Sequence, residues 1–247
     1  MKLLHPPIIE AIVDIDCDMR PKFDLTQMEG KAGDPFRDRY PTSKKRYLEE
    51  FRFEKKGDQP TDYSTTRNIQ SIMFIQEGGK QLVQVRAQGF SFNRLAPYSS
   101  LDDYLPEIER AWKIFVKIAS PLRVRTIRLH FINRILLPAE TGNVNLVEYL
   151  KIYPLMPTDN LTLNSFLNQY SATENVSGNK VDVILVGQPF ENQRAPVILD
   201  ISTSRTVDGG VEDWSWLLDN IVLLRGLKNR VFENTLTERC LNLFQQP

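Results

Sequence analysis

The sequence predicts an α+β protein: a unit of strand, helix, antiparallel strands and long helix occurs twice and forms one curved antiparallel sheet with helices on one face. Three observations carry this prediction. Residues 8–19 and 123–138 alternate apolar and polar side chains, which is the pattern of strands with one buried face. Residues 99–119 and 211–236 carry apolar side chains at helical spacing. The order of elements between these landmarks is the same in both halves.

The first half begins with the strand at 8–19, whose polar face carries Glu10, Asp14 and Asp16. Asp24 is placed to cap a short helix. Further strands follow before the long helix, joined in one place by the glycine hairpin of "EGGK". They are expected at 46–56 (a strand or a mixed segment), 68–76 and 81–95, with a turn at 55–60.

The helix at 99–119 has the clearest pattern in the chain. Ser99 or Ser100 can cap it, and a carboxylate follows near the third helical position. Pro106 lacks a backbone donor, so the helix either begins or kinks there. Its apolar stripe consists of Leu101, Leu105, Ile108, Trp112, Phe115 and Ile118.

The second half repeats this order after "SPL". A long strand at 123–138 comes first, followed by a short helix at 144–154. The helix at 211–236 is expected to end near a capping box formed by Thr235 and Glu238. Between them we expect strands at 163–174, 180–187 and 196–205, followed by a polar loop, "DISTSRTVDGG".

We therefore expect one copy of the unit at residues 1–120 and a second at 121–247, sharing one sheet. Self-similarity of this length indicates two fused copies rather than a solenoid. The element order is that of the TATA-binding-protein-like fold, in which long helices cover one face of a curved sheet. A helix-grip sheet around one long helix is the competing layout, and neither fold determines a function.

Composition excludes some classes of function. Lysine plus arginine equals aspartate plus glutamate at 31 each, which disfavours binding of nucleic acid mainly by counterion release. Cys17 and Cys240 have no metal-binding spacing, so we expect buried free thiols in a reducing compartment. The first residues do not have the pattern of a signal peptide, and no apolar run spans a membrane. A cytoplasmic location is expected.

Four stretches resemble a sporadically distributed bacterial family of conserved hypothetical proteins. They are "HPPIIEAIVDI", "FSFNRLAPY", "LHFINRILLP" and "LKNRVFENTLTERCLNLF". The resemblance covers nearly the whole chain. It implies the scattered inheritance seen for mobile elements, toxin–antitoxin pairs and antiviral defence, and it implies no activity, cofactor or catalytic residue.

The sequence offers little for catalysis. His5 and His130 are the two histidines, and phosphate-binding glycine motifs and histidine–metal motifs are absent. We therefore expect no catalytic residue, no metal and no cofactor, with enzymatic activity uncertain but disfavoured. The acidic series from Glu10 to Asp18 could hold a cation, but neighbours on one strand face lie about 7 Å apart.

The binding residues we expect are basic or aromatic. Arg128, His130 and Arg134 share one strand face, where we expect them to pair with the acidic face of residues 8–19. Flanking arginines should keep His130 neutral. Arg94 and Tyr98 precede a capped helix, Arg205 occupies the equivalent place in the second half, and Trp216 cannot share a helix face with Trp214.

The leading hypothesis is a non-enzymatic cytoplasmic protein-binding module that uses its curved sheet to hold another protein, as a partner component in a bacterial defence or toxin–antitoxin system. One alternative is a nucleic-acid-binding protein that uses the concave sheet face. Its phosphate contacts would be Arg86, Arg94, Arg128 and Arg134. The other alternative is an enzyme that acts on a small anionic substrate near "DISTSR". No membrane association is expected, and the oligomeric state is open.

Overall fold

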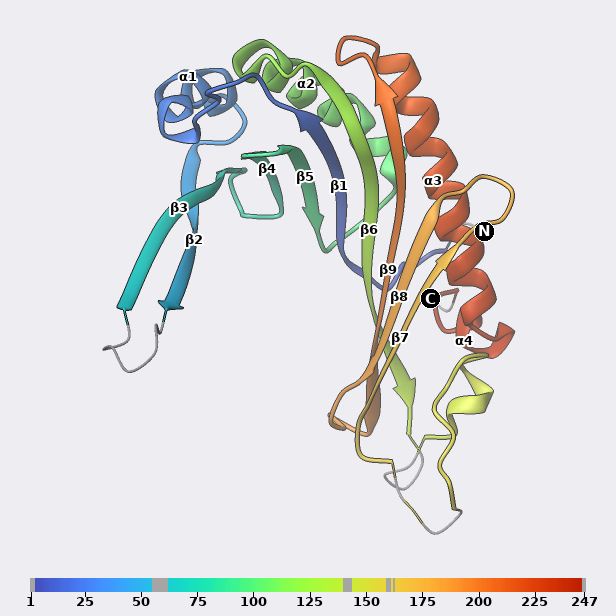
Figure 1. The fold of residues 1–247 in the computed structure, drawn as a ribbon. Coiled ribbons are helices and arrows are strands. Elements are labelled where there is room, and N and C mark those ends of the chain that lie inside the picture. Colours follow the sequence, from blue (N-terminus) through green and yellow to red (C-terminus); the bar gives the residue numbers. More distant parts are fainter. Residues whose placement is uncertain (1–2, 55–61, 140–143, 159–160, 162, 246–247) are drawn as a thin grey trace.

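The computed structural model describes residues 3–54, 62–139, 144–158, 161 and 163–245 (Figure 1). Within these residues nine strands form one antiparallel sheet in the order β2-β3-β4-β5-β1-β6-β9-β8-β7. The sheet is curved, and the helices lie along the outer side of the curve. The predicted α+β class, with a curved antiparallel sheet and helices on one face, is confirmed.

The strands are β1 (Ile8–Asp18), β2 (Thr42–Glu54), β3 (Asp62–Ile75), β4 (Gln81–Arg86), β5 (Gly89–Leu95), β6 (Arg123–Pro138), β7 (Phe166–Thr173), β8 (Lys180–Gly187) and β9 (Arg194–Gly209). The helices are α1 (Leu25–Arg37), α2 (Leu101–Ala119), α3 (Trp214–Thr235) and α4 (Glu238–Asn242), with a 3₁₀ turn, η1 (Leu146–Glu148).

β1 and β6 lie side by side at the centre of the sheet, and Asp14 stands opposite Arg128 in their register. On each side of this pair the strands follow in reverse chain order: β5, β4, β3 and β2 on one side, and β9, β8 and β7 on the other. α2 ends at Ala119, shortly before β6 begins at Arg123. This arrangement is compatible with two fused copies, which remain a prediction.

Burial of the helix-covered face explains why the alternating segments are strands. Ile15 on β1 and Ile127 and Leu129 on β6 are fully buried, whereas their sequence neighbours are only partly covered. Burying one such side chain stabilises the fold by about 1.5–3 kcal/mol. α2 contributes Trp112 and Phe115, which pack against Phe90 of β5. The buried residues form two clusters, one under α1, α2 and the start of α3, and one under the rest of α3 and α4.

Helix capping follows the sequence at two of the three sites proposed from it. The Asp24 side chain accepts a hydrogen bond from the Thr26 amide, and Ser100 accepts one from the Asp102 amide. At the C-terminal helix the cap is Thr237, not Thr235, because Thr237 accepts from the Cys240 amide. α2 begins at Leu101 and continues through Pro106, so the proline does not mark its start.

Two strand predictions were wrong in their extent. Residues 81–95 form two strands, β4 and β5, because the chain turns before Gly89. Gly89 has a φ of 146°, and a Cβ there would lie 2.1 Å from the Ile15 carbonyl oxygen. β9 continues to Gly209, so "DISTSRTVDGG" is mostly strand and not a loop. Pairing with β6 supplies the hydrogen bonds that extend it.

The short helix expected at 144–154 is reduced to the 3₁₀ turn η1, whose cap makes no side-chain hydrogen bond. β2 begins at Thr42, four residues before the start that the sequence predicts. The turn expected at 55–60 lies outside the described residues.

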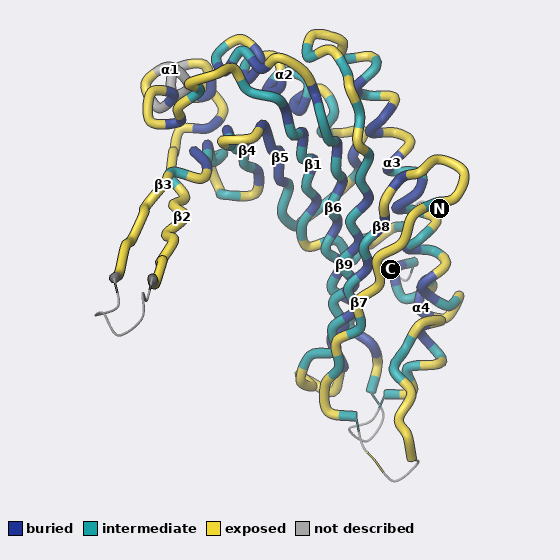
Figure 2. The backbone as a smooth tube through the Cα atoms, viewed as in Figure 1, coloured by how far each residue is buried: buried dark blue, intermediate teal, exposed yellow. Residues whose placement is uncertain are grey.

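The β2–β3 hairpin extends away from the rest of the molecule (Figure 1). Its outer half is exposed on both faces, whereas the central strands are buried or half-buried (Figure 2). We call the paired segments 47–54 and 62–69 the arm. The arm therefore depends on its own cross-strand contacts, and a two-stranded hairpin is marginally stable by itself in water.

Candidate functional site

The concave face of the sheet, opposite the helices, carries most of the charged residues that the sequence singles out. We call it the open face. Its central charged side chains are Glu10, Asp14, Asp16, Arg86, Arg128, His130, Arg134 and Asp200.

Asp14 lies at the middle of a charge network on the open face. It accepts a hydrogen bond from the Ser91 hydroxyl and lies 3.9 Å from Arg128 and 3.7 Å from Arg86. Arg86 also forms an ion pair of 2.6 Å with Asp16. The predicted pairing of β1 acids with β6 bases is thus present at Asp14 and Arg128, but Arg86 of β4 takes the next acid.

The other members of the two series pair elsewhere. Glu10 accepts a hydrogen bond from Asn93 of β5, and Arg134 of β6 pairs with Glu191. His130 forms a hydrogen bond with Asp200 of β9. Each central strand has two neighbours, so a long side chain can reach a partner on either one. The sequence pattern could not show which neighbour it reaches.

For His130 the predicted direction of the pKa shift is wrong. Burial disfavours its charged form, but the hydrogen bond and the negative charge of Asp200 outweigh burial, and Asp14 and Glu10 add to the effect. The net result is that the pKa of His130 is raised. The flanking arginines, which predicted a neutral ring, are less important than the carboxylate on the adjacent strand.

Four predicted binding residues lie on the helix-covered side instead. Arg94 stands opposite Ala11 and places its guanidinium 5.0 Å from the Tyr104 ring of α2. Arg205 stands opposite the buried Ile127. Trp216 packs closely over Gly209, since a Cβ there would meet its ring at 2.0 Å.

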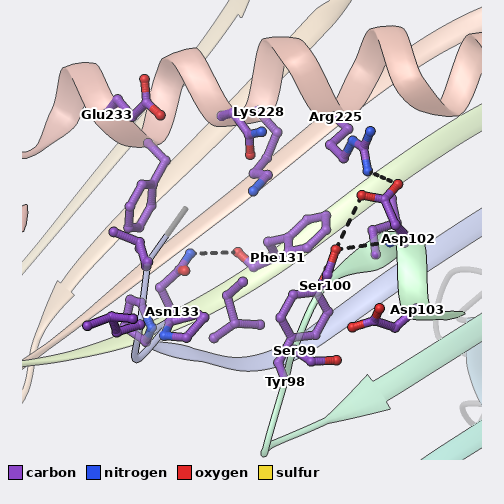
Figure 3. Close-up of a pocket in the computed structure, with 18 of the residues that line it drawn as sticks. Tyr98, Ser99, Ser100, Asp102, Asp103, Phe131, Asn133, Arg225, Lys228 and Glu233 are labelled. Carbon is purple, nitrogen blue, oxygen red and sulfur yellow. Dashed lines mark hydrogen bonds and ion pairs between the residues drawn. The ribbon is translucent and has the colours of Figure 1, made fainter. Parts of the chain in front are cut away.

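Tyr98, the fourth of these residues, lines a cavity of about 910 Å³ between α2, α3 and the N-terminal segment (Figure 3). All four stretches by which the sequence resembles the bacterial family contribute to its walls. Pro6 and Pro7 come from the first, Tyr98 from the second, Asn133 from the third and Lys228 from the fourth.

The apolar walls of the cavity come from the N-terminal segment, β6 and the helices. They include Leu3, Leu4, Ile8, Leu101, Phe131, Phe232 and Leu241. Asn133 is buried, and its amide nitrogen donates to the carbonyl oxygen of Leu199 at 2.9 Å. Arg225 lies at the rim and pairs with Asp102 at the start of α2.

Lys228 is the cavity residue with the least satisfied charge. It is only 8% exposed, and its ammonium nitrogen lies 4.2 Å from the centre of the Phe131 ring. Within the described part of the chain it makes no hydrogen bond and no ion pair. Burial lowers the pKa of Lys228 to about 8; Arg225 adds to this effect and Glu233 opposes it.

Lys228 is not among the binding residues expected from the sequence, although the sequence carries a signal for it. Leu217, Ile221, Leu224 and Phe232 are buried on α3. Continuing their spacing of three and four residues from Leu224 reaches position 228. A lysine on the apolar face of a helix indicates either a snorkelling side chain or a binding group.

The two cysteines are buried and free, as predicted. Burial is the main cause that raises the pKa of both thiols to about 12; at Cys17 the charge of Asp16 adds to it. A thiol with so high a pKa is a poor nucleophile at neutral pH.

Two further features are absent from the described residues. No three His, Cys, Asp or Glu side chains gather there as a metal site requires. No helix there combines the length and hydropathy needed to cross a membrane.

No protein-family model matches the chain, and no curated protein has a significantly similar sequence. The resemblance to the sporadically distributed bacterial family therefore stays a prediction.

Proposed function

We propose that the protein is a non-enzymatic binding module that holds a protein partner through the arm. The observation that carries this proposal is the distribution of side chains on the arm. Tyr47, Phe51, Phe53 and Tyr63 all lie on one face of the hairpin, since their register places them on alternate positions. The opposite face carries Leu48, Glu50, Arg52, Ser64, Thr66 and Asn68.

Most of this aromatic face is uncovered, although Arg67 also lies on it and places its guanidinium 3.9 Å from the centre of the Tyr47 ring. Phe51, Phe53 and Tyr63 are 63%, 69% and 73% exposed, and the rings of Phe53 and Tyr63 meet edge to face at 5.4 Å. Aromatic side chains are enriched in the cores of protein interfaces. Fully covering one such side chain buries about 150–250 Å². Because these four are already partly covered, they supply roughly 500 Å², more than half of the roughly 800 Å² that each partner contributes to a typical interface.

The open face is less suited to binding a phosphate backbone. Arg86, Arg128 and Arg134 each lie within 4 Å of a carboxylate, and Arg94 lies on the other side of the sheet. Binding of nucleic acid would have to break these pairs. The charges of the open face are therefore better explained as part of the architecture of the sheet.

The context of the proposal is a bacterial defence or toxin–antitoxin system in the cytoplasm. The resemblance to the bacterial family supports a defence or toxin–antitoxin system. The free thiols of Cys17 and Cys240 support a reducing compartment.

Affinity capture from the native host with matched arm variants tests the proposal. Phe51→Ser with Phe53→Ser removes two rings from the aromatic face. Leu48→Ser with Arg52→Ser makes the same number of changes on the opposite face and is the control. We expect the partner captured by the wild type to be retained by the control and lost by the aromatic variant.

Two results would contradict the proposal. One is equal capture by the aromatic variant, with thermal unfolding showing that all proteins are folded. The other is light scattering that shows a dimer of the purified wild type converted to a monomer by the aromatic variant. In that case the arm would bind a second copy of the chain and not a different protein.

A further inference from the structure

The cavity between α2 and α3 is a built space that the proposed protein partner does not use. The arm belongs to β2 and β3 at one edge of the sheet. The cavity lies beside the central strand β6, on the helix-covered face. At about 910 Å³ it falls in the range of 300–1,000 Å³ typical of small-molecule sites. Such sites combine apolar walls with a few oriented polar groups, and this cavity has both.

Lys228 is the polar group that specifies a ligand. Figure 3 shows its side chain directed from α3 toward Phe131, inside the ring of residues that line the cavity. Burying an ammonium group is costly unless an anion compensates it. The Phe131 ring compensates only in part, because a cation–π contact is a modest attraction and supplies no hydrogen-bond acceptor. The described residues provide no carboxylate or other hydrogen-bond partner for this amine.

The charges around Lys228 restrict the anion. Arg225 is already paired with Asp102, so among the described residues that line the cavity Lys228 is the cation without a carboxylate. Glu233 and Asp103 also line the cavity and would repel a doubly charged group. A ligand with a single negative charge fits this balance better than a phosphate monoester does.

We infer that the cavity binds a small molecule with an apolar body and one carboxylate, which pairs with the ammonium group of Lys228. The apolar body lies against Leu3, Ile8 and Phe232 on the walls. The carboxylate accepts hydrogen bonds from the amine, which has no acceptor among the residues that the structure describes. This site is independent of the arm and of the protein partner proposed above.

Octanoate is a suitable probe, and octanamide and octyl phosphate are its matched controls. Binding to the intact chain is measured by isothermal titration calorimetry at pH 7. We expect octanoate to bind more tightly than either control. Lys228→Met keeps the length and apolar stem of the side chain but removes the charge. We expect it to weaken octanoate binding by roughly tenfold or more, the loss typical of a charged hydrogen bond.

Two matched variants complete the experiment. Lys117→Met removes an exposed lysine near the end of α2 and should leave octanoate binding unchanged. Phe51→Ser with Phe53→Ser should also leave it unchanged, which separates this site from the partner-binding arm. A folded Lys228→Met protein that binds octanoate like the wild type would overturn the inference. So would equal binding of octanamide or octyl phosphate, or no binding of octanoate at millimolar concentration.

Discussion

Two basic side chains show how differently the fold treats single residues. His130 sits on the open face beside Asp200, and that carboxylate holds the pKa of the histidine above its ordinary value although burial opposes it. Lys228 sits among apolar walls, and burial lowers its pKa to about 8. The native state stabilises the charged form of His130, whereas it destabilises the charged form of Lys228. The protein therefore carries a local cost at Lys228 that a bound anion would relieve.

Lys228→Met should stabilise the free protein at pH 7. The folded pKa of about 8 lies below the ordinary 10.5, so the folded state binds fewer protons than the unfolded state between these values. The cost of the buried ammonium is complete below pH 8 and disappears as the pH rises toward 10.5. We expect a gain of roughly 3 kcal/mol at pH 7, measured by urea unfolding.

The difference in unfolding free energy between Lys228→Met and wild type should shrink between pH 8 and 10.5. A difference that stays constant over that interval would show that packing, not charge, causes the stabilisation. Comparing the two proteins at each pH removes the contributions of other groups that titrate there. The charged or titratable groups beside Lys228 are Arg225 and Glu233 on α3, Asp102 and Asp103 on α2, and Tyr98 before α2.

At the level of whole elements, a partly buried hydrogen-bond network joins the segment that follows α1 to α2 and β4. Glu107 of α2 accepts a hydrogen bond of 2.9 Å from the Tyr40 hydroxyl, which itself accepts one from Gln81 at 2.8 Å. Arg39 and Arg110 donate to the same carboxylate. The network fixes the end of α1 against the first turns of α2, so these helices cover the sheet in one arrangement.

Glu107→Ala should destabilise the protein by about 2–3 kcal/mol, because it leaves the Tyr40 hydroxyl without its acceptor and the Arg110 guanidinium with only the longer contact of 3.6 Å to Asp38. Chemical denaturation measures this loss. The matched control is Glu109→Ala, which breaks only the exposed pair with Lys113 and should cost well under 1 kcal/mol. Equal effects of the two substitutions would show that the network contributes nothing beyond a surface ion pair.

The alternation of apolar and polar residues predicts a strand well where one face of that strand is buried along its whole length. β6 was predicted with its true limits because it is covered on one face along almost its whole length. β2 was ambiguous because its aromatic residues lie on an exposed arm, where burial imposes no alternation. β9 was cut short because its polar end is stabilised by pairing with β6, a contact between residues about 80 positions apart.

At the scale of the whole molecule, the candidate site arises from the meeting of distant segments. Phe131 belongs to one core cluster and Phe232 to the other, and both line the cavity. α2 and α3 approach each other only in the folded chain, where Arg225 pairs with Asp102. The sequence therefore predicted Tyr98 as a binding residue, from its place before a helix. It could not show that Tyr98 and Lys228 face the same space.

The charges between β1 and β6 lie where the two sides of the sheet join, so they also concern the molecule as a whole. Asp14→Ala should lower the free energy of unfolding by about 1–2 kcal/mol, because the carboxylate is partly buried and accepts from Ser91 as well as facing Arg86 and Arg128. Arg128→Ala should cost less, since the guanidinium is more exposed and its distance to Asp14 is 3.9 Å.

A double-mutant cycle of Asp14→Ala and Arg128→Ala, followed by urea unfolding, measures how strongly the two sides are coupled. We expect a coupling energy of about 0.5 kcal/mol, as for other partly exposed pairs. Capture of the protein partner should persist in both variants, because the arm is remote from this contact. Additive effects would mean that the pair does not join the two sides. Unchanged stability with loss of the partner would instead make the open face the recognition surface and displace the arm from that role.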